Sequence, residues 1–533
     1  MADSFVNLFR QPDSAAVELE KGWFPLEYTG GSWSRPGDVS VTVSPDGERD
    51  EMPVVLAPSA TPIRRIKFRW RSDNSGVKRL LRDSWCVSVS DLGWMPLIAE
   101  QPLPWYFHTF DGVLTHGYGV RTMCNSFCFW QMDSDGINLW LDVRNGGDGV
   151  IAREPLTAAV IVTRRGVEGE SAYAAAKAFC KRMCPAPVLP GRPVYGLNNW
   201  YYAYGKISAD SVRADAALSW ELAGDTPYPP FMVIDDGWQP TKTRGPFDRG
   251  NMFMGEMDRV AQDIAGQGCV PGIWIRPLMT AERVPEDWLH PYRRESDYYG
   301  GAILDPSRPE VLDYVARTAR RVEDWGFRLI KYDFTCPDFM GAESFHGWRL
   351  TDEGWHMSDR SRTNAQIIME LYRAIRDAAP GCLMQGCNTY NHLTAGINHL
   401  QRSGWDTSGR SWERTRTAGV NTLAFRLPQN GSFFLVDPDC PAFTPDTPVE
   451  MNLRFLELAA MSGGVLIASV TPGLLDREQK ERVKAAFRTA AAGKSMEPLD
   501  WMDTLCPARY RYEGDGQIYR FDWYTPTDGA ALE

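Results

Sequence analysis

Beyond residue 190, short apolar segments alternate with longer amphipathic ones, and this alternation constrains the fold more than any other feature of the chain. Each apolar segment has the length of a buried parallel strand and is followed by a helical pattern of about ten or more residues. Eight strands are predicted, at residues 194–201, 231–236, 271–276, 328–333, 382–387, 398–403, 433–437 and 464–469. Eight such units are typical of a (β/α)8 TIM barrel, and a doubly wound sheet is the weaker alternative.

Two of the intervening helices have clear end signals. Ser208 is predicted to cap the start of a helix that Gly224 ends. A second helix is predicted over residues 363–379, because its apolar residues recur with helical spacing and Pro380 follows it.

The N-terminal part of the chain shows a different pattern, with apolar and polar residues alternating in short runs such as "INLWLDVRNGGDG" and "LTAAVIVTRRG". This period of two predicts antiparallel strands packed as a β-sandwich. A predicted helix at about residues 170–183 and the Pro-rich "CPAPVLPGRP" then mark a boundary. We therefore predict a multidomain α/β and β chain: an N-terminal β-sandwich (1–190), a central (β/α)8 barrel (191–493) and a short C-terminal β region (494–533).

Charge and composition exclude several classes of partner. Among 533 residues, 57 are basic and 68 acidic, and no basic run could neutralise a phosphate backbone, so no nucleic-acid partner is expected. No window reaches the roughly 20 apolar residues of a spanning helix, so no membrane partner is expected. The first residues lack a charged start followed by an apolar run, which predicts a cytoplasmic location. Eleven cysteines without paired spacing predict free thiols. The oligomeric state stays open, and a homo-oligomer is possible.

The motif content leaves carboxylates as the reacting groups. The seven histidines show no HxH or HExxH spacing and no CxxC occurs, so no catalytic metal is predicted. There is also no Ser-His-Asp set, no GxSxG and no glycine loop that would cradle a phosphate. Proton transfer and nucleophilic attack are therefore assigned to Asp and Glu side chains.

Barrel sites form at the carboxyl ends of the strands, where this chain places carboxylates, aromatic rings and cations. Asp333 ends the fourth predicted strand within "KYDFT", and Asp406 follows the sixth. Hydrolysis of a glycosidic bond with retention needs two carboxylates about 5–5.5 Å apart on opposite faces of the sugar. We expect Asp333 and Asp406 to reach across one pocket in this way. The adjacent pair Asp235 and Asp236 suits the binding of several hydroxyls better than a catalytic proton.

Six motifs occur in order along the chain: "NNWYYAYGKIS", "FMVIDDGWQ", "GIWIRP", "LDPSRPEVLDYV", "LIKYDF" and "SGWDTSG". Over about residues 194–470 they resemble glycoside hydrolase family 36, the α-galactosidases and α-N-acetylgalactosaminidases with their raffinose synthase relatives. The resemblance implies a β-supersandwich, a (β/α)8 barrel and a β domain. It also implies cofactor-independent hydrolysis of a terminal α-linked sugar with retained configuration.

The resemblance implies roles for single residues. Asp333 matches the nucleophile that forms the covalent glycosyl-enzyme, and Asp406 matches the acid/base. Sugar contacts are implied for Asp235 and Asp236 (the 4- and 6-hydroxyls of galactose), for Lys331 and, through a likeness of "RSGWD" to the related family 27, for Arg402. We expect Lys331 to keep Asp333 ionised, and burial beside Trp405 to raise the pKa of Asp406.

Two departures from the family pattern bear on the sugar. Arg276 in "WIRP" stands where the family usually has "WFEPE", and it either neutralises the carboxylate-rich pocket or holds an anionic substituent. The segment "QGCNTYNH" replaces "CSSGG", so Cys387 and Asn388 either bind near the second carbon of the sugar or fill space. The sugar, its linkage and the aglycone therefore stay open.

Other interpretations of these residues also stay open. Asp333 at its strand end is alternatively part of a structural ion pair, and Asp439 and Asp338 are alternatives to Asp406 as acid/base. Stacking on the sugar and plain packing are both open for Trp200, Trp274 and Trp405. The long segment 337–360 is a candidate cover for the site. A transglycosylase of raffinose synthase type and an inactive carbohydrate-binding barrel are the alternative functions.

Overall fold

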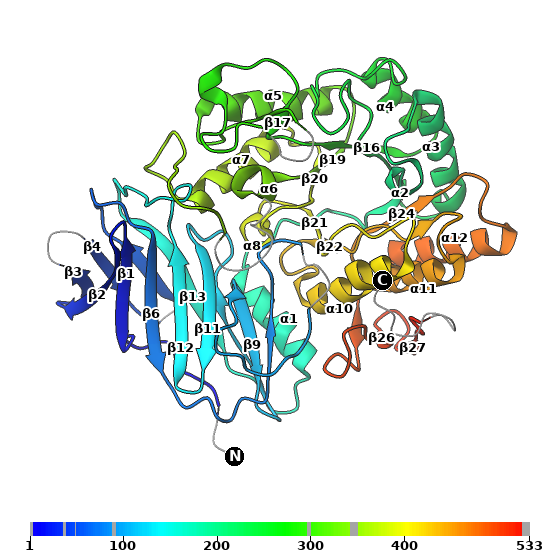
Figure 1. The fold of residues 1–533 in the computed structure, drawn as a ribbon. Helices are drawn as coiled ribbons and strands as arrows, with labels where there is room; N and C mark the ends of the chain where they lie inside the picture. Colours follow the sequence, from blue (N-terminus) through cyan, green and yellow to red (C-terminus); the bar gives the residue numbers. More distant parts are fainter. Residues whose placement is uncertain are drawn as a thin grey trace.

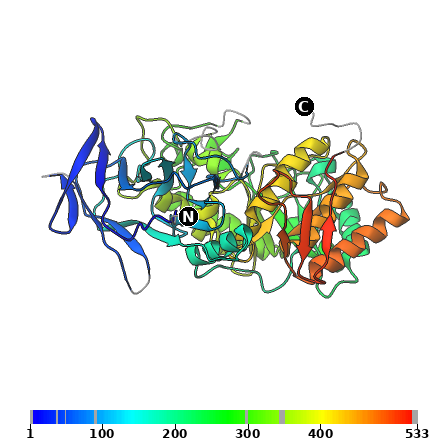
Figure 2. The ribbon, with the colours of Figure 1, turned by 90° about the horizontal axis from the view of Figure 1, so that it is seen from below.

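The structure of the protein is a computed structural model that describes residues 4–35, 39–47, 50–87, 92–295, 300–341 and 350–524. A large antiparallel sheet from the N-terminal part lies beside an α/β region built by the rest of the chain (Figures 1 and 2). Within the described ranges, no helix is both long and apolar enough to cross a membrane.

The N-terminal sheet contains thirteen strands in the order β7-β9-β10-β13-β5-β4-β3-β2-β1-β6-β12-β11-β8. The first half of β2 pairs with β1 and its last three residues pair with β3, so one strand joins two layers of the sheet. Between those layers, the rings of Phe107 and Trp130 pack with centroids 6.0 Å apart. The predicted antiparallel region is confirmed, and its strands form one continuous order. They are β1 (Ser14–Leu19), β2 (Gly22–Thr29), β3 (Ser32–Arg35), β4 (Val39–Val43), β5 (Met52–Leu56), β6 (Arg65–Arg71), β7 (Arg79–Arg82), β8 (Leu103–Pro104), β9 (Tyr106–Phe110), β10 (Thr115–Val120), β11 (Phe127–Asp133), β12 (Gly136–Asp142) and β13 (Leu156–Arg164).

Helix α1 (Ala172–Met183) follows the sheet, as predicted, and begins at the cap residue Ser171. Its Phe179 ring lies directly on β10, where a Cβ at Gly117 would come within 2.5 Å of the ring. Glycine at position 117 therefore lets the helix approach the sheet closely enough to bury its apolar face.

The α/β region contains eight parallel strands that follow one another around a curved sheet, each overlapping its predicted segment. Pairing runs from β14 to β22 in chain order, and β24 pairs with β14. No ladder between β22 and β24 is present in the described residues, although the Val465 N–H donates to the Val436 carbonyl at 2.9 Å across that gap. The strands are β14 (Tyr195–Asn198), β15 (Phe231–Ile234), β16 (Val270–Ile275), β19 (Leu329–Tyr332), β20 (Leu383–Gly386), β21 (Leu400–Arg402), β22 (Leu435–Asp437) and β24 (Leu466–Val470), with β23 (Ala442–Phe443) beside β24.

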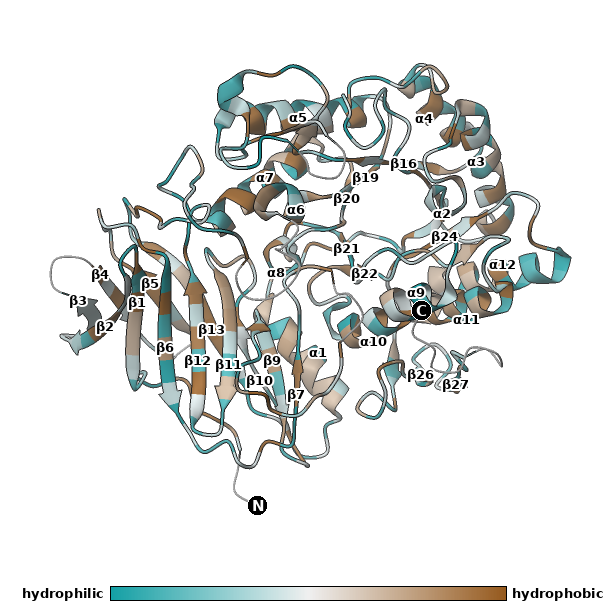
Figure 3. Cartoon of the chain, in the orientation of Figure 1, coloured by the Kyte–Doolittle hydropathy of each residue, from teal (hydrophilic) through white to brown (hydrophobic). Residues whose placement is uncertain are grey.

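Helices connect these strands, and the two end signals in the sequence are confirmed. Ser208 and Ser211 form a capping box at the start of α3, and Gly224 caps its end. Hydrophilic and hydrophobic stretches along α5 and α12 mark the amphipathic helices in Figure 3. The helices are α2 (Trp200–Ala203), α3 (Ala209–Ala223), α4 (Met257–Gly266), α5 (Pro309–Asp324), α6 (Thr335–Met340), α7 (Asn364–Ala378), α8 (Asn391–Thr394), α9 (Trp412–Thr415), α10 (Thr422–Arg426), α11 (Val449–Met461) and α12 (Arg477–Ala491).

Buried polar contacts join the N-terminal sheet to the α/β region. Arg426 of α10 forms an ion pair with Asp83 at 2.7 Å, and both side chains are almost fully buried. The ring of His392 in α8 stacks on Trp105 with centroids 5.1 Å apart, and its Nε2 lies 2.9 Å from the Val120 carbonyl of β10. Contacts of this kind hold the two regions in one arrangement.

A small antiparallel sheet of β25 (Met496–Pro498), β26 (Arg509–Tyr512) and β27 (Ile518–Arg520) follows α12. The Trp412 indole N–H donates to the Trp523 carbonyl at 3.0 Å, which ties this sheet to α9. The predicted boundaries near residues 190 and 493 stay predictions.

All eleven cysteines lie within the described ranges, buried and without a disulfide. The prediction of free thiols is therefore confirmed. Burial also raises the pKa of several of these thiols, Cys180 and Cys382 among them, which keeps them protonated.

Candidate active site

A cavity of about 270 Å³ opens where the parallel strands end. Eight of the twelve predicted site residues line it. They are Trp200, Asp235, Asp236, Trp274, Lys331, Asp333, Asn388 and Asp406. They lie in or just after six strands, β14, β15, β16, β19, β20 and β21. The periodicity of the apolar segments located the strand ends correctly, and parallel strands bring those ends to one edge of the sheet.

Asp333 lies directly after β19 and accepts three hydrogen bonds. Its Oδ1 accepts from the Asn388 side chain at 2.6 Å and from the Phe334 N–H at 2.7 Å. Its Oδ2 accepts one hydrogen bond from the described residues, from the Trp274 indole N–H at 3.1 Å. Three donors around two acceptor oxygens suit a carboxylate, and they hold Asp333 in one orientation with Oδ2 the less occupied oxygen.

Asp406 follows β21 and presents its carboxyl to the cavity, with 51% of the side chain exposed. Its Oδ1 lies 3.2 Å from Nη2 of Arg402. Desolvation raises the pKa of this carboxyl above its ordinary value, and the charge of Arg402 opposes that rise. The negative charges of Asp439 and Asp333 raise it further. The expected direction of this pKa shift is thus confirmed, and a carboxyl in this state suits proton donation.

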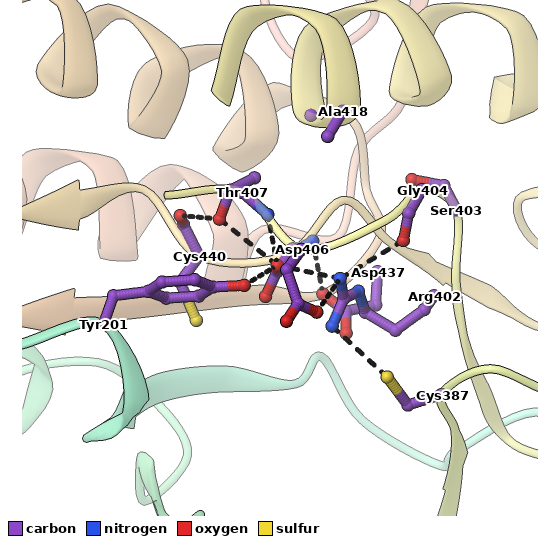
Figure 4. A network of polar contacts seen from close by, with 12 residues as sticks. Tyr201, Cys387, Arg402, Ser403, Gly404, Asp406, Thr407, Ala418, Asp437 and Cys440 are labelled. Atoms are coloured by element: carbon purple, nitrogen blue, oxygen red, sulfur yellow. Dashed lines mark hydrogen bonds and ion pairs between the residues drawn. The ribbon is translucent and has the colours of Figure 1, made fainter. Parts of the chain in front are cut away.

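The same Arg402 atom pairs with Asp439 at 2.8 Å, and both side chains are buried. Figure 4 shows Arg402 with its further partners Cys387 and Gly404. Tyr201 and the Thr407 N–H also donate to Asp439. Burial alone would raise the pKa of Asp439, but the charges of Arg402 and Lys331, with hydrogen bonds from Tyr201 and Thr407, together outweigh it, and the pKa lies below its ordinary value. Asp439 is therefore a buried counterion that does not line the cavity, which leaves Asp406 as the better candidate for the acid/base.

Lys331 forms its ion pair with Asp235. Its Nζ lies 2.7 Å from Oδ2 of Asp235, which also accepts from Asn198 at 2.8 Å. Burial would lower the pKa of Lys331, but attraction to Asp235, together with smaller contributions from Cys387 and Asp439, outweighs it and raises the pKa well above the ordinary value. The expectation that Lys331 keeps Asp333 ionised stays a prediction. The ion pair that Lys331 forms is with Asp235, because strands β15 and β19 point these two side chains at each other.

Asp236 faces away from its neighbour and has its own partners. Its Oδ1 accepts from Gln239 at 2.6 Å and from the Thr243 N–H at 2.8 Å, and its Oδ2 accepts from the Thr243 hydroxyl at 2.6 Å. Desolvation raises the pKa of this carboxyl. Both carboxylates of the pair line the cavity, each with a separate set of hydrogen bonds.

The other four predicted site residues do not line the cavity. They are Arg276, Cys387, Arg402 and Trp405. Arg276 forms a two-point ion pair with buried Asp338, at 2.6 and 2.8 Å. This pairing supports the interpretation that Arg276 neutralises a carboxylate of the site. Asp338 itself does not line the cavity. The Cys387 sulfur accepts from Arg402 at 3.4 Å.

Five further residues line the cavity that sequence reasoning missed: Tyr204, Lys242, Thr243, Phe334 and Arg410. Four lining residues, including Asn388, have positive φ, at 46° (Tyr204), 66° (Thr243), 62° (Phe334) and 49° (Asn388). Non-glycine residues in this conformation often gather at functional sites. Nothing in the sequence reveals these conformations, although Phe334 could have been included as the neighbour of Asp333.

The candidate cover at residues 337–360 falls partly outside the described residues, since 342–349 belong to it. The described part from 350 onward packs on the N-terminal region instead of the cavity. Asn145 accepts from the Met357 N–H at 2.8 Å, and the Gly147 N–H donates to the Trp355 carbonyl at 2.9 Å. None of these residues lines the cavity.

The class of fold is defined by an antiparallel sheet packed on an α/β sheet of eight parallel strands. Solved glycoside hydrolase family 36 α-galactosidases share this fold. An α-galactosidase from Thermus thermophilus, in complex with p-nitrophenyl α-D-galactopyranoside, matches with a TM-score of 0.60 at 19% identity over 95% of this chain and 99% of its own.

Two further structures agree. A variant of the family 36 α-galactosidase AgaA from Geobacillus stearothermophilus, in complex with 1-deoxygalactonojirimycin, matches with a TM-score of 0.60 at 14% identity over 92% of this chain and 76% of its own. The galactosidase domain of an α-galactosidase-sucrose kinase matches with a TM-score of 0.57 at 15% identity over 90% and 74%. No protein-family model and no curated protein sequence matches the chain. At these identities the matches show the fold.

Proposed function

We propose that the protein is a retaining glycoside hydrolase that removes a terminal α-linked sugar, an α-galactoside or a related α-glycoside. One observation carries the proposal: Asp333 and Asp406 line the same cavity in opposite environments. Asp333 accepts three hydrogen bonds, whereas desolvation raises the pKa of Asp406. A double-displacement mechanism needs two carboxyl groups at one pocket, one that attacks the sugar and one that donates a proton.

The surroundings support this reaction. The likeness of the fold to α-galactosidases solved with galactosides and inhibitors favours an α-galactoside-type substrate. The cavity volume lies near the lower end of the roughly 300–1,000 Å³ of small-molecule pockets, which suits one sugar ring. In this proposal the eight parallel strands form a (β/α)8 barrel. No step of the reaction needs a cofactor.

In the first step, Oδ2 of Asp333 attacks the anomeric carbon, because that oxygen accepts a single hydrogen bond from the part of the chain that the structure describes. The bond to the departing oxygen breaks, its electron pair stays on that oxygen, and Asp406 gives it a proton. A glycosyl ester on Asp333 results. In the second step, water gives a proton to Asp406 and attacks the same carbon. The Asp333 carboxylate leaves, and the configuration is retained.

The binding roles follow from the same contacts. Asp235 and Asp236 accept hydrogen bonds from the sugar hydroxyls, and Lys331 both neutralises Asp235 and reaches the cavity. Trp274 orients Asp333 through its indole N–H, while Trp200 offers an aromatic face at the cavity wall. Asn388 fixes the second oxygen of Asp333.

Azide rescue tests the two catalytic roles separately. In Asp333→Ala, azide should enter from the vacated face and give a glycosyl azide of inverted configuration from an aryl α-glycoside. In Asp406→Ala, azide should intercept the glycosyl ester and give the retained azide. Proton NMR identifies the product anomer. Asp248→Ala, at a half-buried carboxylate outside the cavity, serves as the control. Loss of activity without rescue in both variants, or an inverted first product from the wild type, would contradict the mechanism.

A further inference from the structure

Two cations line the cavity without a role in the proposed chemistry. Lys242 lies in the loop after β15, and Arg410 lies in the loop between β21 and α9. Both side chains are exposed. Among the described residues, neither forms an ion pair with a carboxylate, although the protein carries a net charge of −11.

The other cations near the site differ in this respect. Lys331 is paired with Asp235, Arg402 with Asp439 and Arg276 with Asp338, and these three cations are buried. Their charges are therefore balanced within the protein. Lys242 and Arg410 present charge that the described part of the protein does not balance, on the lining of a cavity that binds the substrate in the proposed function.

Tyr204 holds both cations in place. Its backbone carbonyl accepts from Lys242 Nζ at 2.8 Å, and the Arg410 guanidinium carbon lies 4.5 Å from the centroid of its ring. The Tyr204 hydroxyl also accepts from the Gly409 N–H at 3.2 Å, which fixes the loop next to Arg410. One residue thus links two loops that are far apart in the sequence.

The stem of Lys242 is confined as well. Its ammonium group lies 5.1 Å from the centroid of the Trp200 ring, which itself packs edge-on against Tyr204. A Cβ at Gly205 would come within 2.8 Å of Cε of Lys242, so glycine at 205 makes room for this side chain. Cations on aromatic faces keep their charge available to a ligand while losing little rotamer freedom on binding.

We propose that Lys242 and Arg410 form a subsite for an oxyanion, so that the glycoside this protein binds carries a carboxylate, sulfate or phosphate group. The inference rests on the proposed function in taking the ligand to be a glycoside. Lys242 retains donors beyond the one used by Tyr204, and the described residues engage no N–H of the Arg410 side chain. A guanidinium and an ammonium together suit an oxyanion.

Matched pairs of substrates test the subsite and locate the charge. The first pair is 4-nitrophenyl α-D-galactopyranoside and its 6-sulfate, which places the charge on the sugar. The second is the 4-carbamoylphenyl and 4-carboxyphenyl α-D-galactopyranosides, which places it on the aglycone. We expect the wild type to show a higher kcat/KM for the charged member of one pair, and that pair identifies the source of the anion. Equal or lower values for both charged members would overturn the inference.

Variants assign the preference to the two cations. Lys242→Gln and Arg410→Gln should each reduce the ratio of charged to neutral kcat/KM by about fivefold, the size expected for an exposed ion pair. Sodium chloride should weaken the wild-type preference through screening. Lys206→Gln removes an exposed lysine two residues from Tyr204 that does not line the cavity, and it should leave the ratio unchanged. If the double variant of Lys242→Gln and Arg410→Gln kept the wild-type ratio of charged to neutral kcat/KM, that result would also overturn the inference.

Binding separates this inference from the proposed function. Calorimetry with Asp333→Asn measures the affinity for each pair without turnover. Tighter binding of a charged glycoside that depends on Lys242 and Arg410 supports the subsite even where the wild type hydrolyses none of the four compounds, a result that would count against the proposed hydrolase alone. Hydrolysis without charge preference would contradict the subsite alone.

Discussion

Nη2 of Arg402 lies 2.8 Å from Oδ2 of Asp439 and 3.2 Å from Oδ1 of Asp406, so one guanidinium nitrogen serves a buried carboxylate and a cavity-facing one. Because Asp439 takes the shorter contact, Asp406 receives only part of the stabilisation that Arg402 offers to a negative charge. This division of one cation between two carboxylates helps to keep the pKa of Asp406 raised.

The first prediction concerns the pH dependence of activity. In Asp439→Asn, a negative charge that raises the pKa of Asp406 is lost, and Arg402 is free to pair more closely with Asp406. Both changes lower the pKa of the acid, so the alkaline limb of kcat/KM should move to lower pH by about 0.5–1 unit. The pH profile with an aryl α-glycoside measures this shift. Asp248→Asn is the control, and a shift to higher pH would contradict the assignment of Asp406 as the acid.

The second prediction concerns the orientation of Asp333. Trp274→Phe removes the one hydrogen bond to Oδ2 that the described residues supply, while keeping most of the buried ring. We expect kcat to fall about tenfold, the effect of about 1.4 kcal/mol on the barrier, with a smaller change in KM. Trp238→Phe is a matched control, because its indole N–H donates to the Trp274 backbone carbonyl at 2.8 Å instead of to a catalytic carboxylate. Equal losses of kcat in both variants would show a structural effect instead.

The third prediction concerns a buried carboxyl outside the cavity. Asp215 of α3 accepts from the Tyr202 hydroxyl at 2.5 and 2.6 Å, and burial raises its pKa from 3.8 to about 7. The folded protein therefore keeps this proton between about pH 4 and 7, whereas the unfolded chain releases it. The stability contributed by this group is full below pH 4 and is lost as the pH rises to 7.

Asp215→Asn does not titrate and should escape this loss. The Tm of the variant relative to that of the wild type should rise between pH 4.5 and 7 and level off above pH 7.5. Differential scanning calorimetry at several pH values measures the difference, and Asp248→Asn, at a half-buried carboxylate, should show no such trend. Parallel Tm curves for Asp215→Asn and the wild type would refute the raised pKa.

The fourth prediction concerns the buried pair of Arg276 and Asp338. Arg276→Met leaves the Asp338 carboxylate buried without its partner, which should cost about 3–5 kcal/mol of stability. Adding Asp338→Asn removes the stranded charge, so the double variant should recover a large part of the lost Tm. A double variant less stable than Arg276→Met would contradict this account. The charge preference between the matched glycosides should stay as in the wild type, since Arg276 does not line the cavity.

Much of this architecture is predictable from local sequence. Burial on both faces makes a parallel strand a short apolar run, so the eight strands can be located within a few residues. Because parallel strands end at one edge, the same runs also predict that Asp333 and Asp406 face a common cavity, and both side chains line it. Their catalytic roles stay a prediction, which azide rescue tests.

Tertiary structure alone decided which charges meet. Lys331 stands two positions from Asp333 in the sequence but pairs with Asp235, 96 positions away. Arg276 binds Asp338, and Lys242 and Arg410 meet at Tyr204 from separate loops. The physical reason is that periodicity along a strand is a local property, whereas the partner of a side chain depends on which neighbouring strand it faces and on the path of the loops above it.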